Sequence, residues 1–532
     1  MLLPHKRWMC IARFAKITAA HVKYYLSITT NKGSTHMSTK DIGRVILLGF
    51  DGMDFDLTTE MISQGLLPNL KKLSDEGGFS PLLSVFPPDS IPAWITTFTG
   101  VDPSTHGIID HVNYLLDDFS ECPIDTSVFH EKTFWDRIGK DANKKVAVVN
   151  PFMAYPVWPV NGVMVSGPVF VEGDIECSDD SYLKGTSIPE SIGGIVNFPN
   201  KTNMKPYYDN MVRDTQEQVD FGIDLIRNNE IDFLFQTIVT TDRVQHHYWR
   251  YCDKTDPTYP GPSEIDNTIP EFFTLMDNIV GQFLAELNDN DVLLIMSDHG
   301  HGMRCTECFN INEYLRRKGY MKSAAGKKKF SKKIIIEVMK NKVLKFMHDN
   351  NLEDYISKIA KFVPNAKALK KGTHISNFDE SKAYCPDFAG TNPFGGICIN
   401  KELVDDYDSF RDQLMTELGE VEHEGEKMFT WIRKREDLYS GELIDRYPDI
   451  LYEMPPRYGT GFSLHSDLVT INPTHKKISG GHKKNGIFFV NKTDQWDINQ
   501  KDCKITNMFE TIVSLYGLSG DSATTKSFLN EK

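Results

Sequence analysis

Six side chains of two chemical types could together hold metal ions. They are three aspartates and three histidines, namely Asp51, Asp242, His246, Asp298, His299 and His482. Carboxylate oxygens and imidazole nitrogens form a mixed ligand set that suits Zn²⁺ and also Mn²⁺. Because six ligands are more than one tetrahedral zinc uses, the set predicts two divalent ions. Two ions about 4 Å apart can clamp the attacking and leaving oxygens of a phosphoryl displacement.

The spacing of these residues favours a shared site. Asp242 and His246 are four residues apart, which places both on one face of a helical turn. His482 follows two glycines and precedes an apolar run at 487–490. This is the pattern of a ligand at a strand edge, so we favour His482 over His475. His247 and His301 neighbour the ligands and are expected near the site without binding metal.

Ser90 is the candidate nucleophile. It lies at the start of a short helical stretch with Pro92 in the first turn. A helix N-terminus binds anions, and a metal on the same oxygen would favour the alkoxide. The alternative is that Ser90 only caps the helix. Asp54 and Asp56 begin another helical stretch, where they suit the helix dipole, and are expected to face solvent.

The elements that position these side chains alternate along the chain. Apolar runs at 44–50, 145–149, 232–239 and 291–296 have the pattern of buried parallel strands. Helical stretches are expected at 57–76, 91–99, 208–228 and 269–288. The alternation predicts an α/β protein with a mostly parallel sheet covered on both faces. Ligands bind beyond the carboxyl ends of such strands, where three of the four runs deliver Asp or His.

Several segments in a fixed order resemble one family. They are ILLGFDGMD, LLPNLKKL, the segment 90–100 followed by VDPSTHGIID, TDRVQHH, MSDHGHG, FNINEYLRRKGY and GGHKKNGIFF. Together they resemble the alkaline phosphatase superfamily, in its nucleotide pyrophosphatase/type I phosphodiesterase branch and the prokaryotic predicted phosphohydrolases. The resemblance covers about 44–320 and 383–515. It implies a doubly wound α/β fold with helices on both faces.

The resemblance also implies how the site residues divide between two metal ions. One ion would be held by Asp242, His246 and His482. The other ion would be held by Asp51, Asp298 and His299. The hydroxyl oxygen of the nucleophile, Ser90, would bind to the same ion.

One departure from the family pattern concerns substrate binding. Pyrophosphatases of this branch carry an Asn shortly after the HGI(I/V) segment, where its amide contacts a phosphate oxygen. Here His111 stands there and an Asn follows only at Asn113, so both are candidate substrate-binding residues and the choice between diester and monoester stays open. The branch also commonly uses Thr where this chain has Ser90, a chemically equivalent nucleophile.

The chain divides into four predicted parts. Residues 1–40 form a basic, poorly ordered extension, which could be a targeting presequence or precede a translation start at Met37. Residues 41–320 form the first part of the catalytic core. Residues 321–373 form an inserted helical cap, since 321–345 hold nine Lys and a single acid, Glu337. We expect this cap to fold over the mouth of the site, where its lysines would attract an anionic substrate. Residues 374–532 form the second part of the core, with the last metal ligand.

Composition narrows the partners and the location. The chain has 532 residues, a net charge of −14 and 25% charged residues, as in a globular protein. Its acidity disfavours nucleic-acid binding, and its longest apolar runs are too short to span a membrane. Nine scattered cysteines suggest reduced thiols and a cytoplasmic protein. A structural zinc at Cys305 and Cys308 is disfavoured, because no second ligand pair accompanies them.

These observations predict a two-metal phosphohydrolase that acts on a small anionic phosphate ester. Ser90 would attack phosphorus, and metal-activated water would release the covalent phospho-enzyme intermediate. Phosphodiesterase or nucleotide pyrophosphatase activity is favoured. The alternatives are a phosphomonoesterase, a transferase of phospho-headgroups, a sulfatase or an inactive binding protein. The sulfatase is disfavoured because Trp94 replaces the Arg of the sulfatase motif, and the inactive protein because no ligand is missing.

Overall fold

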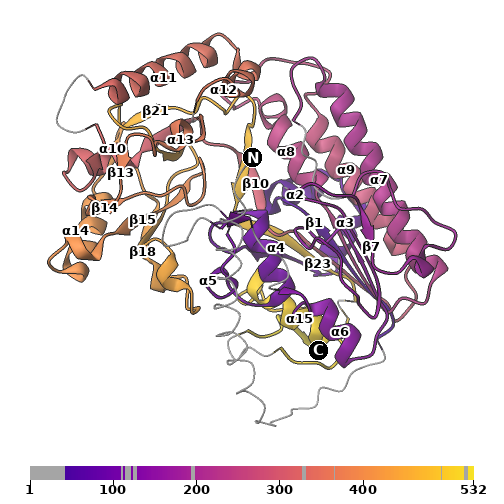
Figure 1. The fold of residues 1–532 in the computed structure, drawn as a ribbon. Coiled ribbons are helices and arrows are strands. Elements are labelled where there is room, and N and C mark those ends of the chain that lie inside the picture. The colour runs from indigo at the N-terminus through magenta and orange to yellow at the C-terminus, as the bar shows by residue number, and fades with distance from the viewer. Residues whose placement is uncertain are drawn as a thin grey trace.

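The protein folds into two lobes that share one continuous chain (Figure 1). The computed structural model describes residues 42–109, 112–113, 122–123, 129–169, 171–192, 198–325, 331–364, 366–492, 494–520 and 525–531. The expected N-terminal extension 1–40 and His111 therefore lie outside the described residues. We call residues 304–478 the second lobe and the rest of the described chain the main lobe.

An eight-stranded sheet forms the centre of the main lobe. Its strand order is β2-β23-β9-β1-β8-β5-β6-β7. The bounds are β1 Val45–Phe50, β2 Phe79–Leu83, β5 Val146–Val149, β6 Gly162–Ser166, β7 Glu176–Cys177, β8 Phe233–Ile238, β9 Val292–Met296 and β23 Asn485–Val490. The five strands from β9 to β6 run parallel, whereas β23 and β7 pair antiparallel with their neighbours. The predicted mostly parallel sheet is confirmed.

Helices cover both faces of this sheet, because alternate strand residues point to opposite sides. Val45 and Leu47 of β1 belong to one buried cluster, and Ile46 and Leu48 belong to the other. The first cluster includes residues of α4 Ser90–Thr99, α6 Phe134–Asp141 and α15 Met508–Ser514. The second includes residues of α2 Phe55–Ser63, α3 Pro68–Asp75, α7 Met204–Asn228, α8 Thr240–Cys252 and α9 Thr268–Ala285.

The helix expected at 57–76 is two helices, α2 and α3. The break falls at Gly65, which has a φ of 75°, and Pro68 begins the second helix. Glycine reaches this left-handed conformation without steric cost, and proline fits the first helical turn. The prediction of one continuous helix was wrong, because Gly65 ends the first helix and Pro68 begins the second.

The second lobe has small sheets of its own. One orders its strands β14-β15-β19-β18 and another β20-β11-β21. The bounds are β11 Glu307–Asn310, β14 Ala383–Tyr384, β15 Phe394–Ile399, β18 Trp431–Lys434, β19 Ile450–Glu453, β20 Tyr458–Gly461 and β21 Val469–Ile471. These strands pack on a third buried cluster, together with α10 Ile311–Arg317 and α14 Tyr407–Gly419. The predicted division at residue 374 stays a prediction, and the chain re-enters the main sheet later, at β23.

The described part of the Lys-rich segment is mostly helical and begins with the short strand β12 Lys322–Ser323. It forms α11 Lys332–Asp349, α12 Ile356–Ala360 and α13 Ala366–Lys371. α11 runs along the outer edge of the second lobe (Figure 1). No helix within the described ranges is both long enough and apolar enough to cross a bilayer.

Candidate active site

Three neighbouring strands bring the predicted aspartates to one edge of the main sheet. Asp51 follows β1, Asp298 follows β9, and Asp242 lies in the first turn of α8, directly after β8. Because β1 lies between β9 and β8 and all three run parallel, their carboxyl ends meet. Gly52, with a φ of 70°, donates its N–H to Oδ1 of Asp298 at 3.0 Å and so ties two of these ends together.

Ser90 faces this edge from the first position of α4. Its Oγ donates to Oδ1 of Asp51 at 3.1 Å and lies 3.1 Å from Nε2 of His299. Asp89, and not Ser90, caps the helix, because its carboxylate accepts from the N–H of Ile91. The capping alternative for Ser90 is therefore wrong, and its hydroxyl is turned toward the acidic cluster.

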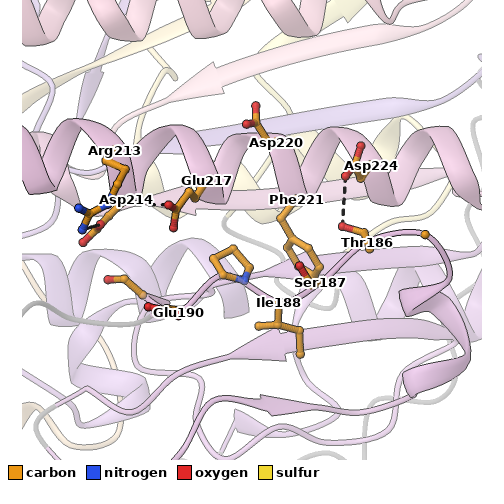
Figure 2. A pocket seen from close by; sticks show the side chains of 13 residues that line it. Thr186, Ser187, Ile188, Glu190, Arg213, Asp214, Glu217, Asp220, Phe221 and Asp224 are labelled. Atoms are coloured by element: carbon orange, nitrogen blue, oxygen red, sulfur yellow. Dashed lines mark hydrogen bonds and ion pairs between the residues drawn. The ribbon is translucent and has the colours of Figure 1, made fainter.

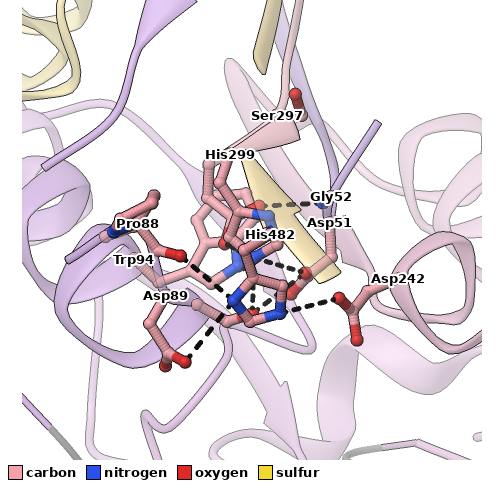
Figure 3. A network of polar contacts seen from close by, with 12 residues as sticks. Asp51, Gly52, Pro88, Asp89, Trp94, Asp242, Ser297, His299 and His482 are labelled. Atoms are coloured by element: carbon pink, nitrogen blue, oxygen red, sulfur yellow. Dashed lines mark hydrogen bonds and ion pairs between the residues drawn. The ribbon is translucent and has the colours of Figure 1, made fainter. Parts of the chain in front are cut away.

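Trp94, one turn further along α4, fixes Asp51 from the other side. Its indole N–H donates to Oδ2 of Asp51 at 2.9 Å (Figure 3). The ring packs directly on β1 at Gly49, where an added Cβ would come within 2.5 Å of it. A glycine at this position is therefore required for Trp94 to reach Asp51.

Three histidines are oriented alike by backbone carbonyls. Nδ1 of His246 lies 2.9 Å from the carbonyl of Gly480, Nδ1 of His299 lies 3.0 Å from that of Gly300, and Nδ1 of His482 lies 3.0 Å from that of Pro88. Since a carbonyl can only accept, each Nδ1 carries the hydrogen and each Nε2 presents a lone pair. This arrangement is typical of histidines that bind metal.

The Nε2 lone pairs converge on the aspartates. Nε2 of His246 and Nε2 of His482 are 3.0 Å apart and lie 3.3 and 3.5 Å from Oδ1 of Asp242. Nε2 of His299 lies 3.4 Å from Oδ2 of Asp298. The structure thus brings together the six proposed metal ligands and Ser90, and Figure 3 draws part of this network.

Two residues of the site are more deeply placed than the sequence indicated. His301 lies on β10 Gly300–Met303, opposite His482 on β22 Gly480–Lys483, and its Nδ1 is 3.6 Å from Asp242. Asp54 is buried, caps α2 and accepts from the N–H of His301, so its expected solvent-facing position was wrong. Asp56 is exposed, as expected. The burial of Asp54 depends on β10, far along the chain, and no local pattern reveals it.

Burial and mutual repulsion shift the titration of these groups. Burial raises the pKa of Asp51 and of Asp298 well above the usual range, and nearby carboxylates add to the shift. Burial lowers the pKa of His246 to about 4 and that of His299 well below normal. Burial also opposes the charged form of His482, but its contact with Asp242 and the charge of Asp89 raise its pKa.

The remaining candidate residues from the sequence are not part of this cluster of aspartates and histidines. His475 is buried against Asp256, with 2.9 Å between Nε2 and Oδ2, and is absent from the cluster. Asn113 belongs to the short strand β3 Val112–Asn113, which pairs with β4 Cys122–Pro123. Cys305 and Cys308 are buried free thiols, and the metal-type clusters found among the described residues include neither.

A cavity away from this site lies in the main lobe. It holds about 1040 Å³ along α7, and Figure 2 shows its acidic lining, with Arg213 beside Asp214 and Thr186 bonded to Asp224. None of the clustered Asp, His or Ser residues lines it. The cavity along α7 and the cluster at the strand ends are therefore separate features of the main lobe.

The sequence match agrees with this geometry. Residues 45–478 match type I phosphodiesterase/nucleotide pyrophosphatase. The chain belongs to this family. It is therefore a metal-dependent phosphoric ester hydrolase of the alkaline phosphatase superfamily, which confirms the predicted family and enzyme class. The family depends on two divalent metal ions. The described residues contain two clusters that could hold a metal ion. One consists of Asp242, His299, His301 and His482, and the other of Asp51, Asp298 and His299.

Two solved structures resemble this chain to different extents. Phosphonoacetate hydrolase from Sinorhizobium meliloti 1021 superposes with a TM-score of 0.51 at 16% identity, covering 93% of this chain and 100% of that one. Human ectonucleotide pyrophosphatase/phosphodiesterase 5 gives a TM-score of 0.44 at 13% identity, covering 92% and 100%. No curated protein matches the sequence.

Proposed function

We propose that this family member is a phosphodiesterase or nucleotide pyrophosphatase-like hydrolase that uses Ser90 as its nucleophile. One observation carries the proposal. The buried Ser90 hydroxyl lies 3.1 Å from both Asp51 Oδ1 and His299 Nε2, at the point where three strand ends meet. A serine that served only the fold would cap α4, and Asp89 already does so.

The donor set fits two divalent ions. Oδ1 of Asp242 and Oδ2 of Asp298 are buried and find no hydrogen-bond partner among the described residues. The Nε2 atoms of His246 and His482 are 3.0 Å apart, although the hydrogen of each ring is engaged at Nδ1. Two facing lone pairs repel unless a cation lies between them. Zn²⁺ suits this mixture of nitrogen and oxygen donors best, and Mn²⁺ is the alternative.

The two ions would divide the cluster. Asp242, His246 and His482 would hold one, with His301 close by, and Asp51, Asp298 and His299 would hold the other beside Ser90. When bound, such ions stabilise the negative charge that develops on the attacking and leaving oxygens. Trp94 keeps Asp51 in place, and the carbonyls of Gly300 and Pro88 keep the imidazoles of His299 and His482 turned inward.

The reaction then proceeds in two displacements. Ser90 Oγ loses its proton and forms a bond to phosphorus as the bond to the leaving oxygen breaks, which gives a phosphoserine ester. A water oxygen next bonds to phosphorus, the bond to Ser90 Oγ breaks, and Ser90 recovers a proton. The substrate is a small anionic phosphate ester, and His111 and Asn113 stay the candidates for contacting it.

The test combines trapping with a substrate series. The metal-loaded protein would be mixed with a nucleoside p-nitrophenyl phosphate, quenched in acid and digested for mass spectrometry. We expect phosphate or nucleotidyl phosphate on the peptide that contains Ser90. Initial rates on bis-p-nitrophenyl phosphate should exceed those on p-nitrophenyl phosphate. A modification at another residue would overturn the nucleophile, and the reverse rate order would indicate a monoesterase.

A further inference from the structure

Helix α11 of the second lobe exposes its apolar side. Its exposed large side chains are Ile335, Ile336, Met339, Val343 and Phe346. The last four follow Ile335 by one, four, eight and eleven residues, which places all five on one face of a helix. A surface helix ordinarily turns such a face inward, so this exposed apolar stripe on α11 is unusual.

The opposite face of α11 packs on the protein through apolar as well as polar side chains, with Met347 buried and Ile334 packed against the third buried cluster. Glu337 is fully buried, and its carboxylate pairs with Lys340 at 2.6 Å and with His374 at 3.3 Å. Asn341 accepts a hydrogen bond from Ser463 at 3.2 Å. A buried carboxylate beside an ammonium and an imidazole fixes the rotation of the helix, because turning it outward would leave those partners unpaired.

The end of α11 is tied to both lobes. Lys476 donates to the carbonyl of His348 and to Asn351, each at 2.7 Å. Lys201 of the main lobe donates to the carbonyl of Asn351 at 2.6 Å. These contacts hold the helix against the body of the protein, so its outward face is a fixed feature of the surface.

Lysines surround the apolar face. Lys332 and Lys333 are exposed at the start of α11, and Lys342 is exposed beside Val343. The segment 332–371 contains ten Lys and four acids, in a chain whose net charge is −14. Two of those acids, Glu337 and Glu353, are buried in ion pairs. The exposed charge around the apolar stripe is therefore mainly positive.

The next helix adds to the apolar surface. Ile359 of α12 is 47% exposed, and Phe362, just beyond its end, is 88% exposed. Lys358, just before Ile359, and Lys361, just before Phe362, are exposed. Figure 1 shows α12 close to the C-terminal end of α11. Exposed apolar side chains interleaved with lysine thus continue past the end of α11.

We propose that α11 and α12 form a docking surface for an anionic lipid membrane, on which the helices lie without crossing it. Apolar side chains on a fixed helix face would enter the acyl boundary, and the flanking lysines would contact acidic headgroups. Charge selects this occupant. Residues 1–40 of this chain carry seven Lys/Arg and no acid, so the lysines would repel them. A second copy would bring the same positive surface against itself.

The experiment measures flotation of the metal-loaded full chain with phosphatidylcholine vesicles, with and without phosphatidylglycerol. The apolar variant is the triple substitution Ile335→Ser, Met339→Ser, Phe346→Ser. The charge variant is Lys332→Gln, Lys333→Gln, Lys342→Gln. A matched control replaces exposed apolar residues elsewhere, Leu66→Ser, Val171→Ser, Leu403→Ser.

The wild type should bind vesicles that contain phosphatidylglycerol and lose that binding as salt rises. The apolar and charge variants should each bind roughly tenfold or more weakly, while the control binds like wild type. Hydrolysis of a soluble nitrophenyl ester should stay within about twofold of the wild-type rate in all of them, which separates this proposal from that on Ser90. No vesicle binding by wild type, or an equal loss in the control, would overturn it. A wild-type dimer that the apolar variant dissociates, seen by light scattering, would show that a second copy is the occupant.

Discussion

Buried carboxylates occur in both lobes, but their partners differ. In the second lobe, Glu313 pairs with Arg316 at 2.7 Å and Arg317 at 2.8 Å, and Asp449 lies 3.5 Å from Arg435. At the strand ends of the main lobe, three buried aspartates crowd together. The ion-pair partners that the described residues offer Asp51, Asp242 and Asp298 are all histidines.

The electrostatics follow this difference. Burial would raise the pKa of Glu313, but hydrogen bonds from Arg316 and Arg317 lower it. Burial raises the pKa of Asp298, and the charge of Asp242 raises it further. A buried charge is costly unless a cation accompanies it. The second lobe supplies its cations from the chain. We propose that metal ions take that place at the strand ends, so that the first arrangement serves stability and the second serves chemistry.

The largest effect is expected at Ser90. Ser90→Ala should lower kcat by at least roughly 10³-fold, because it removes the attacking oxygen. Metal content and melting temperature should change little, since six other ligands remain and Asp89 caps α4. Ser90→Thr is the matched control and should retain part of the turnover. A folded Ser90→Ala protein that still turns over substrate would show that Ser90 is not the nucleophile.

Metal content separates two histidines that lie seven residues apart. His482→Ala should lose about one of two metal equivalents, because Nε2 of His482 faces Asp242 and His246. His475→Ala should lose none, since its ring is buried against Asp256. Elemental analysis after gel filtration measures both. Metal loss from the His475 variant alone would mean that the wrong histidine was assigned.

The paired acids of the second lobe should matter for stability. Glu313→Gln should lower the free energy of unfolding by about 2 kcal/mol at neutral pH, because it breaks charged hydrogen bonds to two arginines. The pKa of Glu313 is lowered on folding, so this stabilisation is present above the unfolded pKa and is lost as pH falls through the folded one. Urea unfolding should therefore show the difference narrowing below about pH 4. A pH-independent difference would contradict the charge argument.

The matching substitution at the site should behave in the opposite way. Asp298→Asn keeps an oxygen for the Gly52 N–H but removes one of the crowded charges. In EDTA the variant should be as stable as wild type, or more stable by about 1 kcal/mol. With excess Zn²⁺ wild type should gain more in melting temperature than the variant, because a lost ligand weakens metal binding. If Asp298→Asn in EDTA lost as much free energy of unfolding as Glu313→Gln does, the proposed difference between the buried acids of the two lobes would be wrong.

Features of the fold that depend on a local sequence pattern could be predicted from the sequence. The four apolar runs became β1, β5, β8 and β9, and the fold class and family are confirmed. The sheets of the second lobe were not foreseen, because their strands are short and β15 contains two glycines. The burial of Asp54 and the approach of His301 to Asp242 depend on β10 pairing with β22, about 180 residues further along the chain. The metal-binding and catalytic roles of the site residues stay predictions.

The smallest effect is expected from the lysines of α11 on a soluble substrate. The sequence alone predicted that a Lys-rich cap attracts the substrate to the site, but α11 runs along the outer edge of the second lobe (Figure 1). Lys332→Gln with Lys333→Gln should therefore lower kcat/KM by less than about twofold at low salt, and the loss should vanish as salt shortens the Debye length. The matched variant is Lys483→Gln.

Lys483 follows His482 in the chain, and its ammonium lies 3.7 Å from Asp54 and 3.5 Å from Asp56. A cation so close to the cluster offsets the charge of its acids, and its removal should lower kcat/KM by more than the loss of two distant lysines does. Initial rates at two salt concentrations compare the α11 variant and the Lys483 variant with wild type. The kcat of the α11 variant should be unchanged, because that helix contacts none of the reacting groups. A large salt-dependent fall in the α11 variant alone would mean that this helix faces the route of the substrate, as the sequence first suggested.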